Sequence, residues 1–399
     1  MERELPSAPL KKGRLTRSLV LVTLIAAFGS SFQYGYNLWV LNHPAMVIQY
    51  FYNITYHQRT QINIDGSLLS FLWDFMVSFF PIGGLVGSLL TGPLADSYGR
   101  KGTLLINSVF SIMSTVLMGC SKLARTYEFI VFAHMIVGVC AGISSSVVPM
   151  YLAEVAPHNL RGGIVLMDRL FFTVGILVAQ IVGLQKALGD QEGWVIMVSL
   201  TGIPAVFQMC LLPFCPESPR YLLIQKRDEE KARQVLKKLR GWDDVEDEIE
   251  ELYLEDICDD AEKHMSPLKL IGLHALRSHL FTEIVMLTSH QLSGIHLVYF
   301  YMERIYTSVG VQQHDMWYIA MPVTMFLVLV TVVMIYVIDF EGRRFPLLLG
   351  LAICGISCLS LTVCLELQST IPWMSYFSTA FIIIFLFGQA IGPGTSRVL

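Results

Sequence analysis

The sequence predicts an all-α protein, a polytopic bundle of membrane-spanning helices. Of its 399 residues, 54% are hydrophobic and 15% are charged, and so small a share of charge does not coat a water-soluble domain of this length. Apolar runs of about 20 residues, the length that crosses a bilayer core as a helix, recur between short polar joints. Helices are the expected spanning element because backbone polar groups in lipid must be satisfied within the segment.

Ten apolar runs are predicted to span the membrane, in a block of six followed by a block of four. The first run follows a basic segment and continues past Gly35 without a small-residue cleavage site, so we interpret it as a retained span and not as a signal peptide. The predicted spans are 19–41, 71–95, 103–120, 128–151, 164–186, 194–214, 279–307, 315–338, 346–367 and 373–394.

The spans divide the chain into four segments. In the loop between the two blocks, the charged runs 228–240 and 243–260 are predicted to form solvated amphipathic helices. The segments are a cytoplasmic tail (1–18), an N-terminal half of six spans (19–214), a cytoplasmic helical loop (215–278) and an incomplete C-terminal half of about four spans (279–399).

The distribution of Lys and Arg predicts which joints face the cytoplasm. These residues are concentrated in the N-terminal tail, in the central loop and in the joints on the same side, such as Arg100-Lys101. By the positive-inside rule, the N-terminus and the central loop are therefore cytoplasmic. The first outer joint then carries the sequon Asn53-Ile54-Thr55, and we expect Asn53 to be glycosylated.

The two blocks carry matching motifs. The sequence Asp-Ser-Tyr-Gly-Arg-Lys at 96–101 follows the second span, and Asp-Phe-Glu-Gly-Arg-Arg at 339–344 follows the eighth. These positions are equivalent if each repeat has six spans, which is the pattern of parallel repeats in transporters whose halves rock about a central site. Such a chain has twelve spans, and this sequence stops in the tenth.

Five further motifs together give a specific resemblance to a known family. They are Phe32-Gln33-Tyr34-Gly35-Tyr36-Asn37, Gly99-Arg100-Lys101, Pro216-Glu217-Ser218-Pro219-Arg220, Gln291-Leu292-Ser293-Gly294 and Gly342-Arg343-Arg344. With them the chain resembles the facilitative hexose (sugar porter) transporters of the major facilitator superfamily, and 26–31, 174–180 and 220–226 are most similar to the fructose transporter subgroup. The resemblance implies two six-helix halves, here truncated in the tenth span. It also implies uniport of fructose and/or glucose by alternating access across the plasma membrane, without enzyme chemistry or a cofactor.

Charged residues at the cytoplasmic span ends are expected to act as an inner gate, as in similar proteins. Pairs between the halves would form in the outward-facing state and part in the inward-facing state, and each contributes only about 0–1 kcal/mol. The alternative is that these charges only anchor the topology. His134 stands where the family usually has Arg, which should weaken the network. The expected pairs are Asp96 with Arg100, Glu154 with Arg161, Glu217 with Arg220, and Asp339 with Arg343.

The sugar site is expected between the halves and needs neutral donors and acceptors, because a hexose presents only hydroxyls. Tyr34 and Gln291 match family positions that hydrogen-bond sugar, although a bond between helices is an alternative role for either. Other positions of the site depart from the pattern. Arg169 and His290 each replace a Gln, His296 and Leu327 each replace an Asn, and Gln389 replaces a His.

These departures leave two interpretations open. Either the site accepts an anionic or altered solute, or selection on sugar transport has relaxed and the chain is a truncated, non-transporting paralogue or splice form. The missing spans and Arg169 together predict little or no hexose transport. Proton coupling would require an acidic residue in the first span, and none lies between Ser18 and Leu41. A receptor-like sugar sensor is a further alternative.

Partners other than a small hexose and the lipid bilayer are not expected. The net charge of −4 and the scattered basic residues argue against nucleic acid. The eight cysteines show neither metal nor disulfide spacing, so no metal site is predicted. The sequence leaves the oligomeric state open.

Overall fold

The computed structural model is an all-helical bundle, which confirms the predicted fold class. No strand occurs among the residues that the structure describes. In that part of the chain, eight helices are long and apolar enough to cross a membrane. The described residues are 13–184, 188, 192–262, 274–300, 302–341, 344–368, 370–371, 373–392 and 394.

The first span is one continuous rod built from α1 (Arg17–Ala26), a π-helical turn at Ala27–Phe32 and α2 (Gln33–Val40). The hydroxyl of Thr16 caps its start by accepting a hydrogen bond from the backbone N–H of Leu19. At Gly35 the rod touches α6 (Arg161–Val182) so closely that an added Cβ would lie 1.9 Å from the backbone oxygen of Phe172. Only glycine permits this approach.

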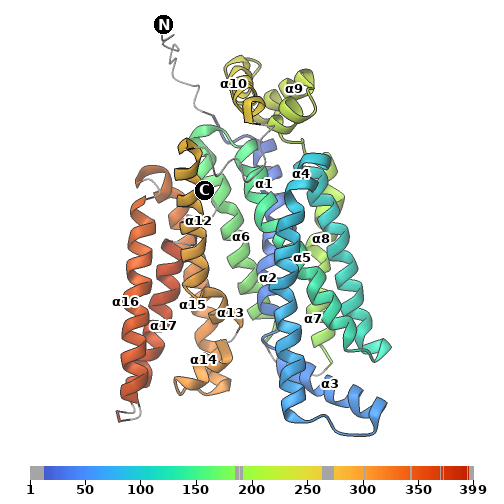
Figure 1. The fold of residues 1–399 in the computed structure, drawn as a ribbon, viewed down its shortest axis with the longest axis vertical. Coiled ribbons are helices and arrows are strands. Elements are labelled where there is room, and N and C mark those ends of the chain that lie inside the picture. Colours follow the sequence, from blue (N-terminus) through green and yellow to red (C-terminus); the bar gives the residue numbers. More distant parts are fainter. Residues whose placement is uncertain are drawn as a thin grey trace.

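The predicted second and third spans are the two limbs of α4 (Gly66–Ala124), which run antiparallel in Figure 1. The chain reverses at Gly99, whose φ of 79° lies in the left-handed region that favours glycine. The first limb packs against α5 (Glu128–Val155) through glycines. An added Cβ at Gly83 or Gly87 would lie 2.3 Å or 2.2 Å from a backbone oxygen of α5.

The N-terminal half is completed by α6 and by the sixth span, which consists of α7 (Trp194–Ser199), α8 (Gly202–Leu211) and a 3-10 turn at Leu212–Phe214. Two apolar clusters form its core. One follows α1, the cytoplasmic part of α5 and the start of α6, and the other continues into the C-terminal half. The halves are therefore joined by packing as well as by the chain.

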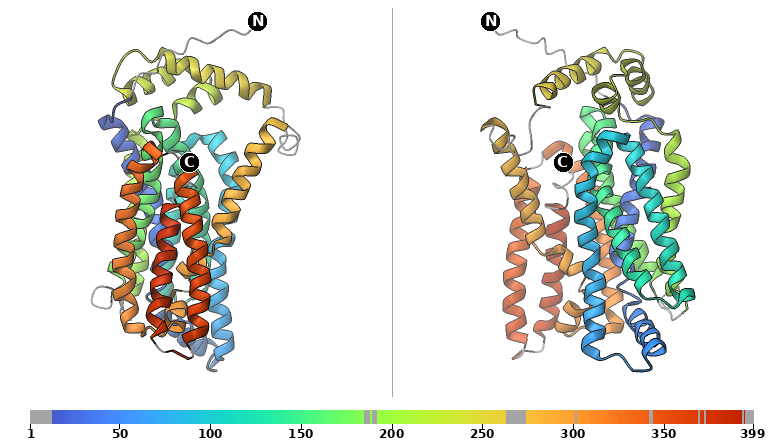
Figure 2. Two further views of the ribbon diagram at one scale, coloured as in Figure 1. Left: turned by 90° about the vertical axis from the view of Figure 1, so that its left-hand side faces the viewer. Right: turned by 45° about the vertical axis from the view of Figure 1, so that its right-hand side comes forward.

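The predicted central helices are present. A π-helical turn (Tyr221–Gln225) is followed by α9 (Glu229–Arg240) and α10 (Glu246–Glu262), and the carboxylate of Asp228 caps α9. Figure 2 shows α9 and α10 lying across one end of the bundle, with α3 (Ala45–Thr60) at the opposite end. The predicted outer joint therefore contains a helix, and the sequon lies within it.

The C-terminal half contains α12 (His274–Leu292), α13 (Ile295–Phe300), α14 (Met302–Ser308), α15 (Gln313–Glu341), α16 (Arg344–Gln368) and α17 (Met374–Ile391). The predicted seventh span, 279–307, is not one continuous helix. It breaks at Gly294, where φ is 81°. Because a broken span presents free backbone groups, such breaks line binding sites in transporters.

Candidate functional site

Side chains from both halves meet inside the bundle around Arg169. Tyr34, on α2, packs its ring against Phe172 with the ring centroids 4.9 Å apart, and it stacks on Phe80 at 6.3 Å. Arg169 lies one helical turn before Phe172, and its guanidinium carbon is 4.7 Å from the centroid of that ring. The N-terminal half thus presents an aromatic wall with one cation at its edge.

The C-terminal half faces this wall with Tyr299. The side chain of Tyr299 is buried, and its hydroxyl interacts with Arg169. The amide of Asn42, which follows the first span, donates to the backbone oxygen of Tyr299 at 2.8 Å. The ring of Trp39 meets the Tyr299 ring edge-on, with the centroids 6.3 Å apart. Tyr299 therefore joins the two halves at three points.

Gln389 lies near the end of α17, in the C-terminal half. Its side chain is only 1% exposed, and neither amide atom has a hydrogen-bond partner among the described residues. A Cβ at Gly394 would lie 2.6 Å from the backbone oxygen of Gln389 and 3.4 Å from the guanidinium of Arg169. The end of α17 that carries Gln389 therefore lies close to Arg169, but this proximity involves the backbone of Gln389, and its amide lies beside the thiol of Cys354 on α16. A buried amide without a partner is costly, which suggests a role for a ligand.

The carboxylate next to Arg169 faces another direction. Asp168 accepts a hydrogen bond of 2.5 Å from the hydroxyl of Ser31, inside the N-terminal half. Successive side chains of an α-helix diverge by about 100°. The hydrogen bond to Ser31 thus lies on the side of α6 that faces the first span, whereas Arg169 contacts Tyr299 of the C-terminal half.

The remaining predicted site residues lie near the break in the seventh span. His290 is buried, whereas Gln291 is exposed, and the side chain of His296 lies outside the described residues. Leu327 is buried in the core on α15. Among the described residues no contact joins the side chain of Gln291 to the group around Arg169, so its sugar-binding role stays a prediction.

In this structure the described residues of the predicted inner gate have other partners than those expected. Arg100 pairs with Glu154 at 2.8 Å instead of with Asp96, and their side chains are only 11% and 8% exposed. Arg100 also lies over the ring of Tyr221, 5.5 Å from its centroid. Packing explains the partner of Arg100, because α4 packs along α5 and brings Arg100 next to Glu154. This pair lies within the N-terminal half.

Glu217 is likewise bound by backbone and not by Arg220 in the contacts of the described chain. Its carboxylate accepts from the backbone N–H groups of Lys101, at 3.1 Å, and Ser218, at 2.9 Å. Burial raises the pKa of this carboxyl, and the hydrogen bonds with nearby Lys101 only partly oppose the rise. The side chain of Asp339 and all of Arg343 lie outside the described residues.

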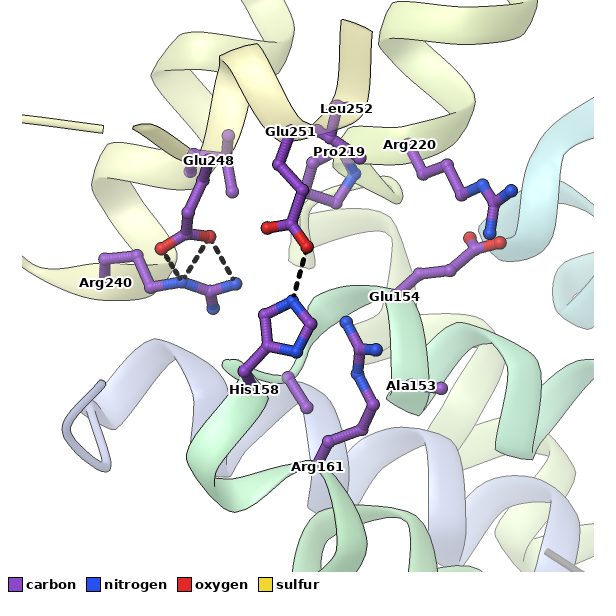
Figure 3. A pocket seen from close by; sticks show the side chains of 12 residues that line it. Ala153, Glu154, His158, Arg161, Pro219, Arg220, Arg240, Glu248, Glu251 and Leu252 are labelled. Carbon is purple, nitrogen blue, oxygen red and sulfur yellow. Dashed lines mark hydrogen bonds and ion pairs between the residues drawn. The ribbon is translucent and has the colours of Figure 1, made fainter. Parts of the chain in front are cut away.

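A cavity of about 120 Å³ lies between the ends of α5 and α6 and the helices α9 and α10 (Figure 3). His158 pairs with Glu251 at 2.8 Å, and Arg240 pairs with Glu248 at 2.8 Å. Arg161 lines the cavity, and its Nε has no partner within the described chain. Glu154 and Arg220 point toward one another (Figure 3). Arg161 and Glu154, its predicted partner, line the same cavity, but no ion pair joins them among the described residues.

The expected effect of His134 on this network is also wrong. His134 is buried in the outer part of α5, beside the ring of Phe80 at 5.2 Å between centroids. Along α5 it lies about 30 Å from Glu154, given a rise of about 1.5 Å per residue. It therefore does not act on the cytoplasmic charges by contact.

Comparisons with known proteins agree with this architecture. Residues 22–397 match the family described as "Sugar (and other) transporter". Two relatives are facilitated glucose transporter member 5 of sheep, Ovis aries (50% identical, covering 97% of this chain and 78% of that one), and member 7 of Homo sapiens (48%, covering 97% and 76%). The xylose symporter XylE, bound to a bromodeoxyglucose, has the same fold (TM-score 0.83, 21% identity, covering 96% and 82%). The resemblance predicted from the motifs is confirmed, and the chain belongs to the sugar transporter family of the major facilitator superfamily.

Proposed function

We propose that this protein is a facilitative hexose transporter, a uniporter of fructose and/or glucose that works by alternating access. The observation that carries the proposal is the meeting of Tyr34, Arg169 and Tyr299 between the two halves. Aromatic faces and amides are the groups that hold a sugar ring and its hydroxyls. The relatives that it matches are carriers, which favours a transporter over the non-transporting alternative.

The orientation is part of this proposal. We place the N-terminus, α9 and α10 in the cytoplasm and α3 outside the cell, in the plasma membrane. The opposite positions of these helices in the bundle support the assignment (Figure 2), as does the positive-inside rule. The cavity beneath α9 and α10 then lies where an inner gate would open.

The test is saturable uptake of labelled fructose and glucose into liposomes that hold the purified chain. Replacing Gln389 by leucine, which is close in size but has no amide, removes one hydrogen bond to the sugar. We expect the half-saturation concentration to rise about 2- to 12-fold, equivalent to about 0.5–1.5 kcal/mol. Gln291→Ala should raise it as well if that side chain also reaches the sugar.

Gln180 supplies the matched control. It is also a glutamine with a buried amide and no partner among the described residues, but it lies on α6 three turns beyond Arg169. Gln180→Leu should leave the half-saturation concentration unchanged. Equal effects of the two leucine variants, or no uptake of either sugar by any variant, would count against the proposed function.

A further inference from the structure

We propose that the central site binds a hexose that carries a single carboxylate, a hexuronate, and that Arg169 is the residue that selects the charge. The inference rests on the proposed function, because it takes the same site and the same alternating-access cycle. It goes further by assigning the substrate a charge.

The first step is the charge of Arg169 itself. Guanidinium stays protonated in proteins, and a charge inside a membrane bundle is costly unless a counter-charge faces it. The side chain is half-buried, and its contacts among the described residues are the ring of Phe172 and the hydroxyl of Tyr299. Both partners are neutral, so neither supplies a counter-charge.

The second step concerns Asp168, the nearest acid in the sequence. Its carboxylate is held by the hydroxyl of Ser31 at 2.5 Å, on the side of α6 that faces the first span. Arg169 faces the C-terminal half instead, toward Tyr299 and Gly394. The acid is therefore committed within the N-terminal half, and the base is left to face the site.

The third step is the chemistry that would complete the site. A carboxylate accepts two parallel hydrogen bonds from a guanidinium, which a hydroxyl such as that of Tyr299 does not. One Arg matches one negative charge, which favours a monocarboxylate over a phosphate dianion. The wall formed by Tyr34 and Phe172 offers an apolar face to a sugar ring.

The solute would also act on the halves. Arg169 belongs to the N-terminal half and Tyr299 to the C-terminal half, so their contact joins the two. A carboxylate that binds the guanidinium of Arg169 in place of the Tyr299 hydroxyl would break this contact. The halves would then be free to rock when the solute is bound.

Transport of a monoanion by a uniporter moves charge, whereas transport of neutral sugar does not. A potential of about 100 mV, positive inside, would accumulate a monoanion about 50-fold at equilibrium and leave the distribution of fructose unchanged. The experiment measures uptake of labelled glucuronate and fructose into liposomes that hold the full chain. Valinomycin and a potassium gradient set the potential.

We expect saturable glucuronate uptake that increases with a positive interior. Arg169→Gln should reduce it at least 10-fold while fructose uptake is retained or rises, and Arg169→Lys should keep part of it. Arg125→Gln, at an exposed arginine between α4 and α5, should change neither uptake. Glucuronate should also raise the thermal midpoint of the purified wild type in detergent, but not that of Arg169→Gln.

One result would overturn the inference and leave the proposed function standing, namely fructose uptake by the wild type without any glucuronate uptake. Glucuronate uptake that is insensitive to the potential, or equal in wild type and Arg169→Gln, would also overturn it. If neither protein transports either solute and glucuronate stabilises neither, both the inference and the proposed function fail.

Discussion

Replacing Glu154 by glutamine removes one charge from a buried ion pair between α4 and α5. The pair holds the turn of α4 that follows Gly99 against the end of α5, with 2.8 Å between its atoms and about nine-tenths of each side chain buried. Glutamine leaves Arg100 charged and buried, beside the ring of Tyr221 and a backbone oxygen at 3.4 Å, with Glu217 as the acid that still interacts with it among the described residues. Breaking such a pair costs about 3–5 kcal/mol.

This loss predicts a large thermal shift. For a folding unit the size of the N-terminal half, about 1 kcal/mol changes the midpoint by about 2–4 °C. Glu154→Gln should therefore lower the melting temperature of the purified protein in detergent by about 6–20 °C. The double variant Arg100→Gln with Glu154→Gln should recover part of that loss, since no unpaired charge remains.

An exposed pair in the same half provides the control. Arg59 on α3 pairs with Glu128 at the start of α5, but these side chains are 42% and 40% exposed. Exposed pairs contribute about 0–1 kcal/mol, so Glu128→Gln should shift the melting temperature by only a few degrees. Similar shifts for Glu128→Gln and Glu154→Gln, or no recovery in the double variant, would refute the argument from burial.

Gly83→Ala should strongly reduce thermal stability in detergent, because the new Cβ would lie 2.3 Å from the backbone oxygen of Met135, whereas Gly84→Ala, at 3.7 Å from the nearest atom, should be tolerated. Asn53→Gln should remove the shift in gel mobility that an amide-cleaving glycosidase causes in the wild type, and equal mobility before and after treatment would argue against an outer α3. Burial raises the pKa of Glu217, so the folded protein binds the proton of this carboxyl more tightly than the unfolded chain does. The contribution of Glu217 to stability therefore falls as the pH rises above the ordinary glutamate range. Glu217→Gln should therefore flatten the melting temperature between about pH 4.5 and 7 and gain relative to wild type at neutral pH.

Most of the fold could be predicted because span length and apolar composition are local properties. The outer helix α3 was missed, although its buried residues Ala45, Ile48, Tyr52 and Thr55 recur with helical spacing. Its turn and sequon residues suggested a loop. The break at Gly294 was missed because the choice of a left-handed glycine depends on packing.

The residues of the candidate site were likewise predicted only in part. Arg169 stood out because a charge within an apolar run is rare, but Tyr299 resembles the other tyrosines near it, and its burial depends on helices far away in the chain. The gate pairs were mispredicted for the same reason. Glu154 is close to Arg161 in sequence, yet it pairs with Arg100, 54 residues away. Partner choice is set by how helices pack, which one sequence does not display.

Gly99 also bears on how this protein enters the membrane during synthesis. A single left-handed residue connects the two limbs of α4, so neither limb has a loop that would let it insert separately. The limbs should leave the ribosome-bound channel together as a helical hairpin, with Arg100 and Lys101 retaining the turn on the side of synthesis. A flexible insert at Gly99 would let the two limbs insert separately. It would also push the turn against Glu217, because a Cβ on Gly99 would lie 2.4 Å from the carboxylate of that residue.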